Sequence, residues 1–139
     1  MIYHSTRMTF KPGVAPEKRQ EVLESLRNQG RLIPSVKSFI VGHDIGGEYE
    51  YAAIYAIEDL DGYWEYLIHP AHHHTDMIGL PMGDKFVSYD VVDDDDPEMP
   101  AKIAALHQRR YDNDPELTKL VSDLASYQGS AAPGPHADR

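Results

Sequence analysis

Hydrophobic and polar positions alternate along the first ten residues, so Ile2, His4 and Phe10 lie on one side of an extended chain. This pattern predicts a strand whose more apolar face carries His4. After a short Pro-Gly turn, apolar residues recur at helical spacing among many charges over residues 15–33. That stretch predicts a surface helix with one buried stripe.

The same reasoning predicts three further strands and a second helix. β-branched and aromatic residues predict strands at 36–43, 49–57 and 85–92. Apolar residues from Leu60 onward recur at helical spacing, and Pro70 is expected to end this helix. Gly and Pro recur over 71–84, where we expect an irregular stretch.

The predicted order of elements is β-α-β-β-α-β, which is typical of an α+β, ferredoxin-like unit. An antiparallel sheet of this order has helices on one face only, so its other face needs a cover. Two copies of the chain can cover each other and close a barrel. We therefore expect a homodimeric αβ barrel that holds a small molecule, either inside the barrel or between the sheet and the helices.

The acidic run at 93–96 and Pro97 mark the end of this unit. Beyond it, apolar residues predict one helix to about Tyr111 and a second that begins at Asp114 and Pro115. The last residues are small, polar and rich in proline, a composition typical of disorder. We expect a dimeric barrel domain at 1–96, a helical extension at 97–128 and a disordered tail at 129–139.

Composition narrows the classes of function. A net charge of −10 opposes the phosphate contacts that nucleic-acid binding requires. The acidic run lacks the spacing and central glycine of an EF-hand loop, so we interpret it as a solvated linker. No apolar stretch approaches the roughly 20 residues that span a bilayer, and the N-terminus predicts a strand instead of an export signal. We expect a cytoplasmic protein that binds neither membrane nor nucleic acid.

Histidine is concentrated in one segment, YLIHPAHHH, from Tyr66 to His74. With no cysteine in the chain, imidazole, carboxylate and phenol groups are the main candidates for catalysis. The segment resembles the stress-responsive dimeric A/B barrel (Dabb) family, as do His4, IPSVKSFIVG at 33–42, the aromatic third strand and Asp90. This resemblance covers about residues 1–92. Within the family, YLIHPAH is especially similar to the olivetolic acid cyclase branch, whose plant polyketide cyclases perform an intramolecular aldol condensation.

The resemblance implies catalytic roles for four side chains. His72 matches the catalytic histidine of the cyclase and Tyr66 its partner tyrosine, while His4 and Asp90 match further polar residues of that site. An imidazole can remove a proton from an acidic carbon, and a tyrosine hydroxyl can hydrogen-bond the enolate or alkoxide that forms. Asp90, if it reaches His72, orients the ring.

A structural role is the alternative for these histidines. They can satisfy backbone groups where the helix ends before Pro70. A lone histidine on an apolar strand face, such as His4, is more often a hydrogen-bonded core residue than a catalyst. Packing is likewise an alternative for Tyr66, which lies next to the core stripe of the second helix.

Neighbouring residues extend the predicted site. We expect substrate contacts from Tyr51, Tyr55, Trp64, His69 and His73. The strand tyrosines are expected to line the barrel, and packing is an alternative for Trp64. His73 and His74 depart from the family pattern, so substrate specificity or a bound metal is expected there.

No cofactor is expected. A metal on His69, His73 and His74 is the weaker alternative, because clustered imidazoles can bind zinc, copper, nickel or iron. Adjacent residues in a turn cannot all point at one ion. The sequence offers His4, His43 and Asp90 as the other candidate ligands.

Three classes of function follow from this interpretation. The leading one is a small-molecule enzyme of secondary metabolism, a polyketide-type cyclase or lyase. The second is a stress-response or ligand-binding Dabb protein without turnover. The third is a cofactor-free or metal-assisted monooxygenase, a class known among related dimeric barrels. In each class the partners are a small molecule and a second copy of the chain.

Overall fold

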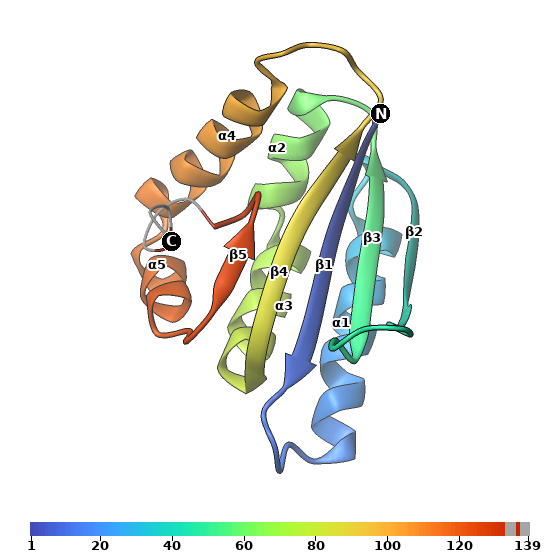
Figure 1. Ribbon diagram of the computed structural model, residues 1–139, viewed down its shortest axis with the longest axis vertical. Helices are drawn as coiled ribbons and strands as arrows, with labels where there is room; N and C mark the ends of the chain where they lie inside the picture. The colour runs from blue at the N-terminus through green and yellow to red at the C-terminus, as the bar shows by residue number, and fades with distance from the viewer. Residues whose placement is uncertain (133–135, 137–139) are drawn as a thin grey trace.

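The computed structural model describes residues 1–132 and 136, and it contains one five-stranded sheet flanked by helices (Figure 1). In chain order the elements are β1 (Ile2–Phe10), α1 (Pro16–Leu32), β2 (Val36–His43), β3 (Tyr51–Ile57), α2 (Leu60–Ile68), α3 (Pro70–Gly79), the 3-10 helix η1 (Leu80–Met82), β4 (Gly83–Val92), α4 (Met99–Asn113), α5 (Pro115–Ser122) and β5 (Tyr127–Gly129).

The sheet has the strand order β2-β3-β1-β4-β5, with β1 antiparallel to both β3 and β4. In this register His4, on the central strand, lies opposite Tyr55 of β3 and Asp90 of β4. The arrangement confirms the predicted α+β ferredoxin-like fold. It also explains how residues that are far apart in the sequence meet beside the central strand.

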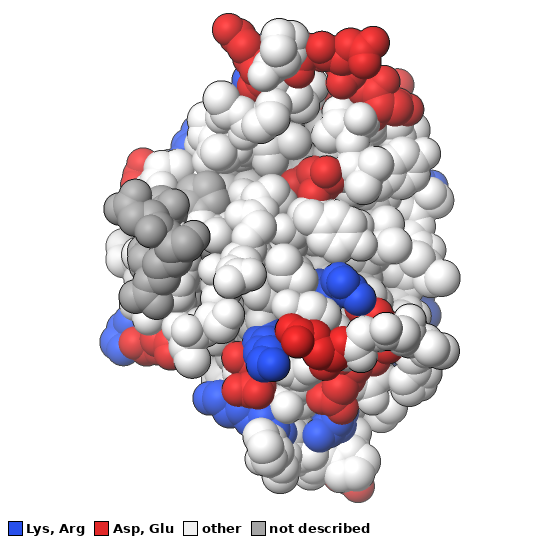
Figure 2. Space-filling view, in the orientation of Figure 1, with Lys and Arg blue, Asp and Glu red and all other residues white. Residues whose placement is uncertain are grey.

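The helices α1, α2 and α3 cover one face of the sheet, and the main hydrophobic core lies between them and the strands. The opposite face, which we call the outer face, exposes large apolar side chains: Tyr3 (41%), Ile40 (65%), Tyr89 (40%) and Val91 (57%). Figure 2 looks onto this face, where largely uncharged surface, interrupted by an isolated acidic group, lies between the acidic groups at the top and the mixed charges below.

Pro70 begins a helix, which corrects the prediction of an irregular stretch over 71–84. The chain leaves α2 at Ile68 and enters α3 at Pro70. Proline fits the first position of a helix, where its missing N–H costs no hydrogen bond. The Nδ1 atom of His69 accepts a hydrogen bond from the backbone N–H of Ala71 at 3.0 Å and caps this helix. The three following histidines are therefore spread around a helix and point in different directions.

The C-terminal extension, comprising α4, α5 and β5, contains the two predicted helices and one strand that was not predicted. Asp114 caps α5 through a hydrogen bond from the Leu117 N–H, at 3.0 Å. β5 then adds to the sheet parallel to β4. None of the described helices is long and apolar enough to cross a bilayer.

The predicted disordered tail at 129–139 differs from the structure over its first residues. Gly129 has a φ of 99°, a conformation that favours glycine, and it ends β5 against Ser88. The backbone N–H of Ala131 donates to the Ser88 hydroxyl at 2.8 Å, and His136 is buried. Small residues therefore let this segment pack closely on β4. Residues 133–135 and 137–139 lie outside the described residues.

Candidate active site

A cavity of about 60 Å³ lies between the sheet and the helices. Strands β1 and β3 contribute one wall and helices α1 and α3 another, while α4, α5 and β5 of the C-terminal extension close the remaining side (Figure 1). Six of the polar groups in its lining matter for the chemistry that follows: His4, Tyr66, His72, Asp76, His107 and Arg110. These six groups come from four elements, β1, α2, α3 and α4, and apolar side chains form much of the remaining lining.

His72 lies on the first turn of α3 and is buried beneath the sheet. Its Nδ1 atom is 3.1 Å from the carbonyl oxygen of Leu67. Because a carbonyl only accepts, Nδ1 carries the proton and Nε2 keeps its lone pair. Burial lowers the pKa of His72 to about 3, and the positive charge of Arg110 acts in the same direction. The imidazole is therefore neutral at physiological pH.

Tyr66 lies against His72, with the two rings stacked at a centroid distance of 4.4 Å. The tyrosine is 2% exposed and its hydroxyl forms no hydrogen bond with any residue that the structure describes. Burial raises the pKa of Tyr66 well above its ordinary value, so the hydroxyl keeps its proton. The cavity thus contains a neutral imidazole beside a phenol that can donate a hydrogen bond.

An ion pair joins the C-terminal extension to this site. The guanidinium of Arg110 on α4 donates to the carboxylate of Asp76 on α3 at 2.5 Å. Burial works against ionisation of Asp76, whereas the charge and hydrogen bond of Arg110 favour it, and the pKa of Asp76 lies below its usual range. The ionised carboxylate lies 3.6 Å from Nε2 of His72, where it can stabilise the imidazolium form. Asp76 thus occupies the place that the sequence analysis predicted for Asp90.

A second polar cluster lies beside the cavity and surrounds the hydroxyl of Tyr63. This hydroxyl is 2.9 Å from Nδ1 of His4, 2.8 Å from Nε2 of His107 and 3.1 Å from a carboxylate oxygen of Asp90. His4 and Asp90 also contact each other at 2.9 Å. Asp90 therefore orients His4 and Tyr63, which corrects the prediction that Asp90 orients His72.

Of the residues predicted to contact substrate, Tyr55 lines the cavity. Its hydroxyl donates to the Leu26 carbonyl at 2.7 Å, so it faces α1 and not a barrel interior. Tyr51 packs between Phe10 and His43 on the same face of the sheet, away from the cavity.

The other predicted contacts lie outside the cavity. Trp64 stacks under the guanidinium of Arg109 at 4.1 Å, and His73 lies 3.3 Å from Asp114. His69 caps α3. The weaker metal set of His69, His73 and His74 does not converge, because these side chains leave the helix and its cap in different directions.

Sequence reasoning missed four functional candidates: Tyr63, Asp76, His107 and Arg110. A local signal existed for Tyr63, His107 and Arg110. Tyr63 precedes Tyr66 by three positions, and His107 precedes Arg110 by three, so each pair shares a helix face. The amphipathic pattern of α4 buries Ile103, His107 and Arg110 together, which indicates a polar site on its core face.

Most of the polar side chains in and beside the cavity lie within a segment that matches one known family. Residues 2–93 match the Stress responsive A/B Barrel Domain family, Dabb. The chain belongs to the Dabb family. Its Dabb domain carries His4, Tyr66, His72 and Asp90, whereas His107 and Arg110 lie beyond the matched residues.

Relatives of the Dabb domain occur in plants and bacteria. The stress-response A/B barrel domain-containing protein HS1 of Arabidopsis thaliana is 32% identical over 94 residues, 64% of this chain and 86% of that protein. A dimeric ferredoxin-like protein of unknown function from Thermobifida fusca is 26% identical with a TM-score of 0.60, covering 66% of this chain and 89% of its own. The hydroxynitrile lyase of Passiflora edulis shares the fold alone, with a TM-score of 0.61 at 13% identity over 68% of this chain and 94% of its own.

Proposed function

We propose that this Dabb protein is a small-molecule enzyme of the cyclase or lyase type, with His72 as general base and Tyr66 as hydrogen-bond donor. One observation carries the proposal: a neutral imidazole with a free Nε2 and a protonated tyrosine with an unused hydroxyl share one cavity. Neither Nε2 of His72 nor the hydroxyl of Tyr66 forms a hydrogen bond with another described residue. A base and a donor are the minimum set for proton removal beside a carbonyl.

The reaction proceeds through an enolate. Nε2 of His72 removes a proton from the carbon next to a carbonyl, while the Tyr66 hydroxyl hydrogen-bonds the carbonyl oxygen as negative charge develops there. The carbanion then attacks a second carbonyl of the same substrate and forms a carbon–carbon bond; a lyase breaks that bond in the reverse direction. The imidazolium returns the proton to the new alkoxide, and Asp76 stabilises the charged ring in the meantime.

The size of the cavity bounds the substrate. About 60 Å³ admits a short carbonyl compound, because one water needs roughly 10–15 Å³ on this measure. A longer polyketide chain requires α4 and α5 to move outward. Arg110, which lines the cavity, favours a substrate that carries an acidic group such as a β-keto acid.

Turnover assays with short 1,3-dicarbonyl and keto-acid substrates test the proposal. His72→Gln is expected to lower kcat by about 10²–10⁴, the range for loss of a general base. Tyr66→Phe is expected to lower kcat by about 10²–10³, since it removes one donor to the oxyanion. His74→Gln, an exposed position on the same helix, is the matched control and should keep full activity. Full activity in both His72→Gln and Tyr66→Phe rules out these roles.

A ligand-binding protein without turnover is the second candidate function. It is favoured by the low pKa of His72, because a weak base gives little driving force for proton transfer. Native mass spectrometry of the purified protein distinguishes the two. A tightly held ligand that is recovered chemically unchanged after long incubation supports this second function, and conversion of the ligand supports the enzyme.

We also propose that the chain forms a homodimer through the outer face. Tyr3, Ile40, Tyr89 and Val91 form an exposed apolar surface there, and such a surface marks a contact site. The Thermobifida relative is itself described as dimeric. Light scattering should detect a dimer that Val91→Asp converts to monomer. Ile68→Asp, at a similarly exposed position on α2, should leave the dimer intact.

A further inference from the structure

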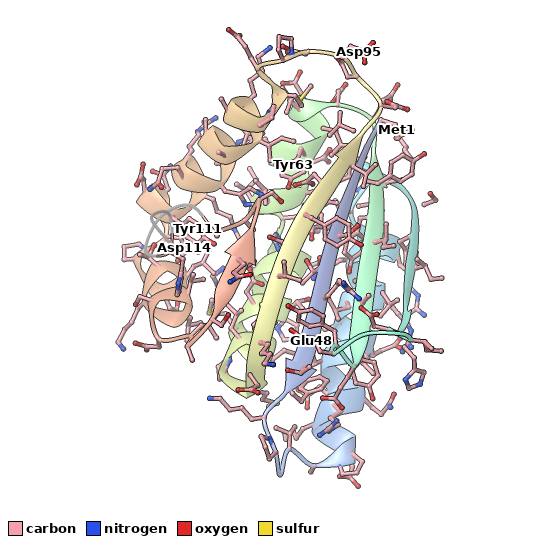
Figure 3. All side chains as sticks on the ribbon, in the orientation of Figure 1. Met1, Glu48, Tyr63, Asp95, Tyr111 and Asp114 are labelled. Atoms are coloured by element: carbon pink, nitrogen blue, oxygen red, sulfur yellow. The ribbon has the colours of Figure 1, made fainter. Side chains whose placement is uncertain are left out.

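Four buried side chains from four different elements converge beside the cavity: His4 from β1, Tyr63 from α2, Asp90 from β4 and His107 from α4. One nitrogen of each histidine and a carboxylate oxygen of Asp90 all lie within 4.8 Å of one another. Figure 3 shows Tyr63 between α4 and the sheet, where its hydroxyl contacts the other three groups.

The separations within this cluster match the edges of a coordination polyhedron. Ligand atoms that lie about 2.1 Å from an ion and at right angles to each other are about 3.0 Å apart. The distances here are 2.9 Å between His4 and Asp90, and 2.9, 3.1 and 2.8 Å from the Tyr63 oxygen to His4, Asp90 and His107. The His107 nitrogen also lies within 4.8 Å of the ligand atoms of His4 and Asp90, so small side-chain rotations bring all four groups onto one ion.

The charge of the cluster is unbalanced without a cation. The Asp90 side chain is 4% exposed, and among the described residues no Lys or Arg pairs with it. Its only ion-pair partner there is His4, which is charged only when protonated. Buried carboxylates are normally paired with a cation or bound to a metal. The nitrogens of His4 and His107 therefore lie beside the Asp90 carboxylate, which has no permanently charged partner among the described residues.

We propose that His4, Asp90 and His107 bind a divalent transition-metal ion, with the Tyr63 oxygen as a fourth, weaker ligand. Two imidazoles and one carboxylate suit Zn²⁺, Fe²⁺, Co²⁺ or Ni²⁺ and disfavour Ca²⁺ and Mg²⁺, which prefer oxygen ligands throughout. His4 and His107 both line the cavity, so the open coordination positions face the space beside Tyr66. The site is separate from His72 and does not depend on the base that we propose there.

The site also explains why a buried histidine lies on α4. His107 is 3% exposed and follows the matched family segment, so the Dabb domain supplies two ligands and the C-terminal extension supplies the third. The predicted surface set of His69, His73 and His74 is a different and more exposed group, which makes it a suitable control.

Cobalt titration of the full chain tests this site. The protein is purified without immobilised metal, dialysed against a chelator and titrated with CoCl₂, and the visible d–d absorption is recorded. We expect saturation at one Co²⁺ per chain and displacement by Zn²⁺. His107→Gln keeps a polar group near Tyr63, and Asp90→Asn keeps the shape of the side chain. Each variant should weaken cobalt binding by more than about 100-fold, which exceeds the effect of losing a contact outside the first coordination shell. The double variant His73→Gln/His74→Gln should bind as the unmodified chain does.

Three results overturn the proposal: no stoichiometric binding, unchanged binding in a folded His107→Gln or Asp90→Asn variant, or loss of binding in the surface double variant. If both ligand variants fail to fold, as circular dichroism would show, the X-ray absorption spectrum of the cobalt-loaded chain decides. Two imidazoles in the first shell support the site, and a shell of water oxygens or one imidazole contradicts it. None of these measurements depends on enzymatic turnover, so failure here leaves the proposed roles of His72 and Tyr66 intact.

Discussion

The Dabb domain and the C-terminal extension contribute different groups to the same cavity. The domain supplies His72 and Tyr66, which come from helices adjacent in sequence and are stacked at 4.4 Å. The extension supplies His107 and Arg110, whose partners Tyr63 and Asp76 lie 44 and 34 positions earlier in the chain. The domain therefore forms its pair through local helix geometry, whereas the contacts of the extension depend on the docking of α4.

The extension is therefore part of the site. Arg110 sets the ionisation of Asp76 and, with burial, keeps His72 neutral. Leu117 and Val121 of α5 close the cavity from the same side. A Dabb domain without these elements would leave Asp76 and His72 facing solvent.

Loss of the ion pair between the two regions should have the largest effect on stability. Arg110→Met leaves the Asp76 carboxylate buried without its cation, which is expected to lower the free energy of unfolding by about 3–5 kcal/mol. Urea unfolding measures this change. Arg109→Met is the matched control: Arg109 stacks over Trp64 at an exposed position and should cost about 0.5–1 kcal/mol. Equal costs for the two variants would show that α4 docks without help from this pair.

The packing of α5 is tested by Leu117→Ala. Leu117 is 1% exposed and lines the cavity, so truncation should cost roughly 2–4 kcal/mol through lost burial and an enlarged cavity. Leu120→Ala, one turn away on the partly exposed side of the same helix, should cost less than half as much. Thermal and urea unfolding should each show a single transition in both variants. A separate early transition that accompanies the loss of α5 would mean that the extension unfolds independently of the Dabb domain.

The fold of the domain could be predicted from sequence because its strands alternate cleanly and its turns contain Gly or Pro. His4 was placed on the correct face of β1 by period-two alternation alone. Pro70 was misinterpreted, because a proline that stops one helix also fits the first position of the next. The error matters for the site, since it concealed that His72 and Asp76 are one helical turn apart.

The contribution of the extension could not be predicted, for a physical reason. Sequence periodicity shows which face of α4 is buried but not which partner covers it, so His107 and Arg110 had no assigned neighbours. β5 was missed because its three residues, which end in Gly129, carry too little pattern, and its order comes from pairing with β4. The pair of His72 and Tyr66 was accessible only through the family resemblance.

The stability of the folded chain is expected to depend on pH through His72. Burial lowers the pKa of His72 to about 3, while the unfolded chain keeps about 6.5. Between these values the unfolded state binds a proton that the folded state does not, so stability falls as pH falls. From pH 7 to pH 5 this group alone should cost about 2 kcal/mol. His107, whose pKa burial also lowers, acts in the same direction.

Urea unfolding at pH 5, 6 and 7 measures this dependence. His72→Gln removes the titrating group, so its stability should decline less between pH 7 and pH 5, by about 2 kcal/mol. Exposed His74→Gln should keep the decline of the unmodified chain. An unchanged pH dependence in His72→Gln would show that the ring is open to solvent, and that the extension does not seal the cavity.

Removal of the N-terminal cap of α5 is expected to have the smallest effect on how firmly the extension is attached. Asp114→Ala removes the carboxylate that accepts from the Leu117 N–H, and loss of such a cap costs about 1 kcal/mol. Asp123→Ala, at an exposed position just after the same helix, should change the free energy of unfolding by less than about 0.5 kcal/mol. Because the cap fixes the first turn of α5, hydrogen exchange should accelerate there in Asp114→Ala and stay unchanged in β1. Faster exchange in both regions would instead mean that α5 and the central strand open together, as one cooperative unit.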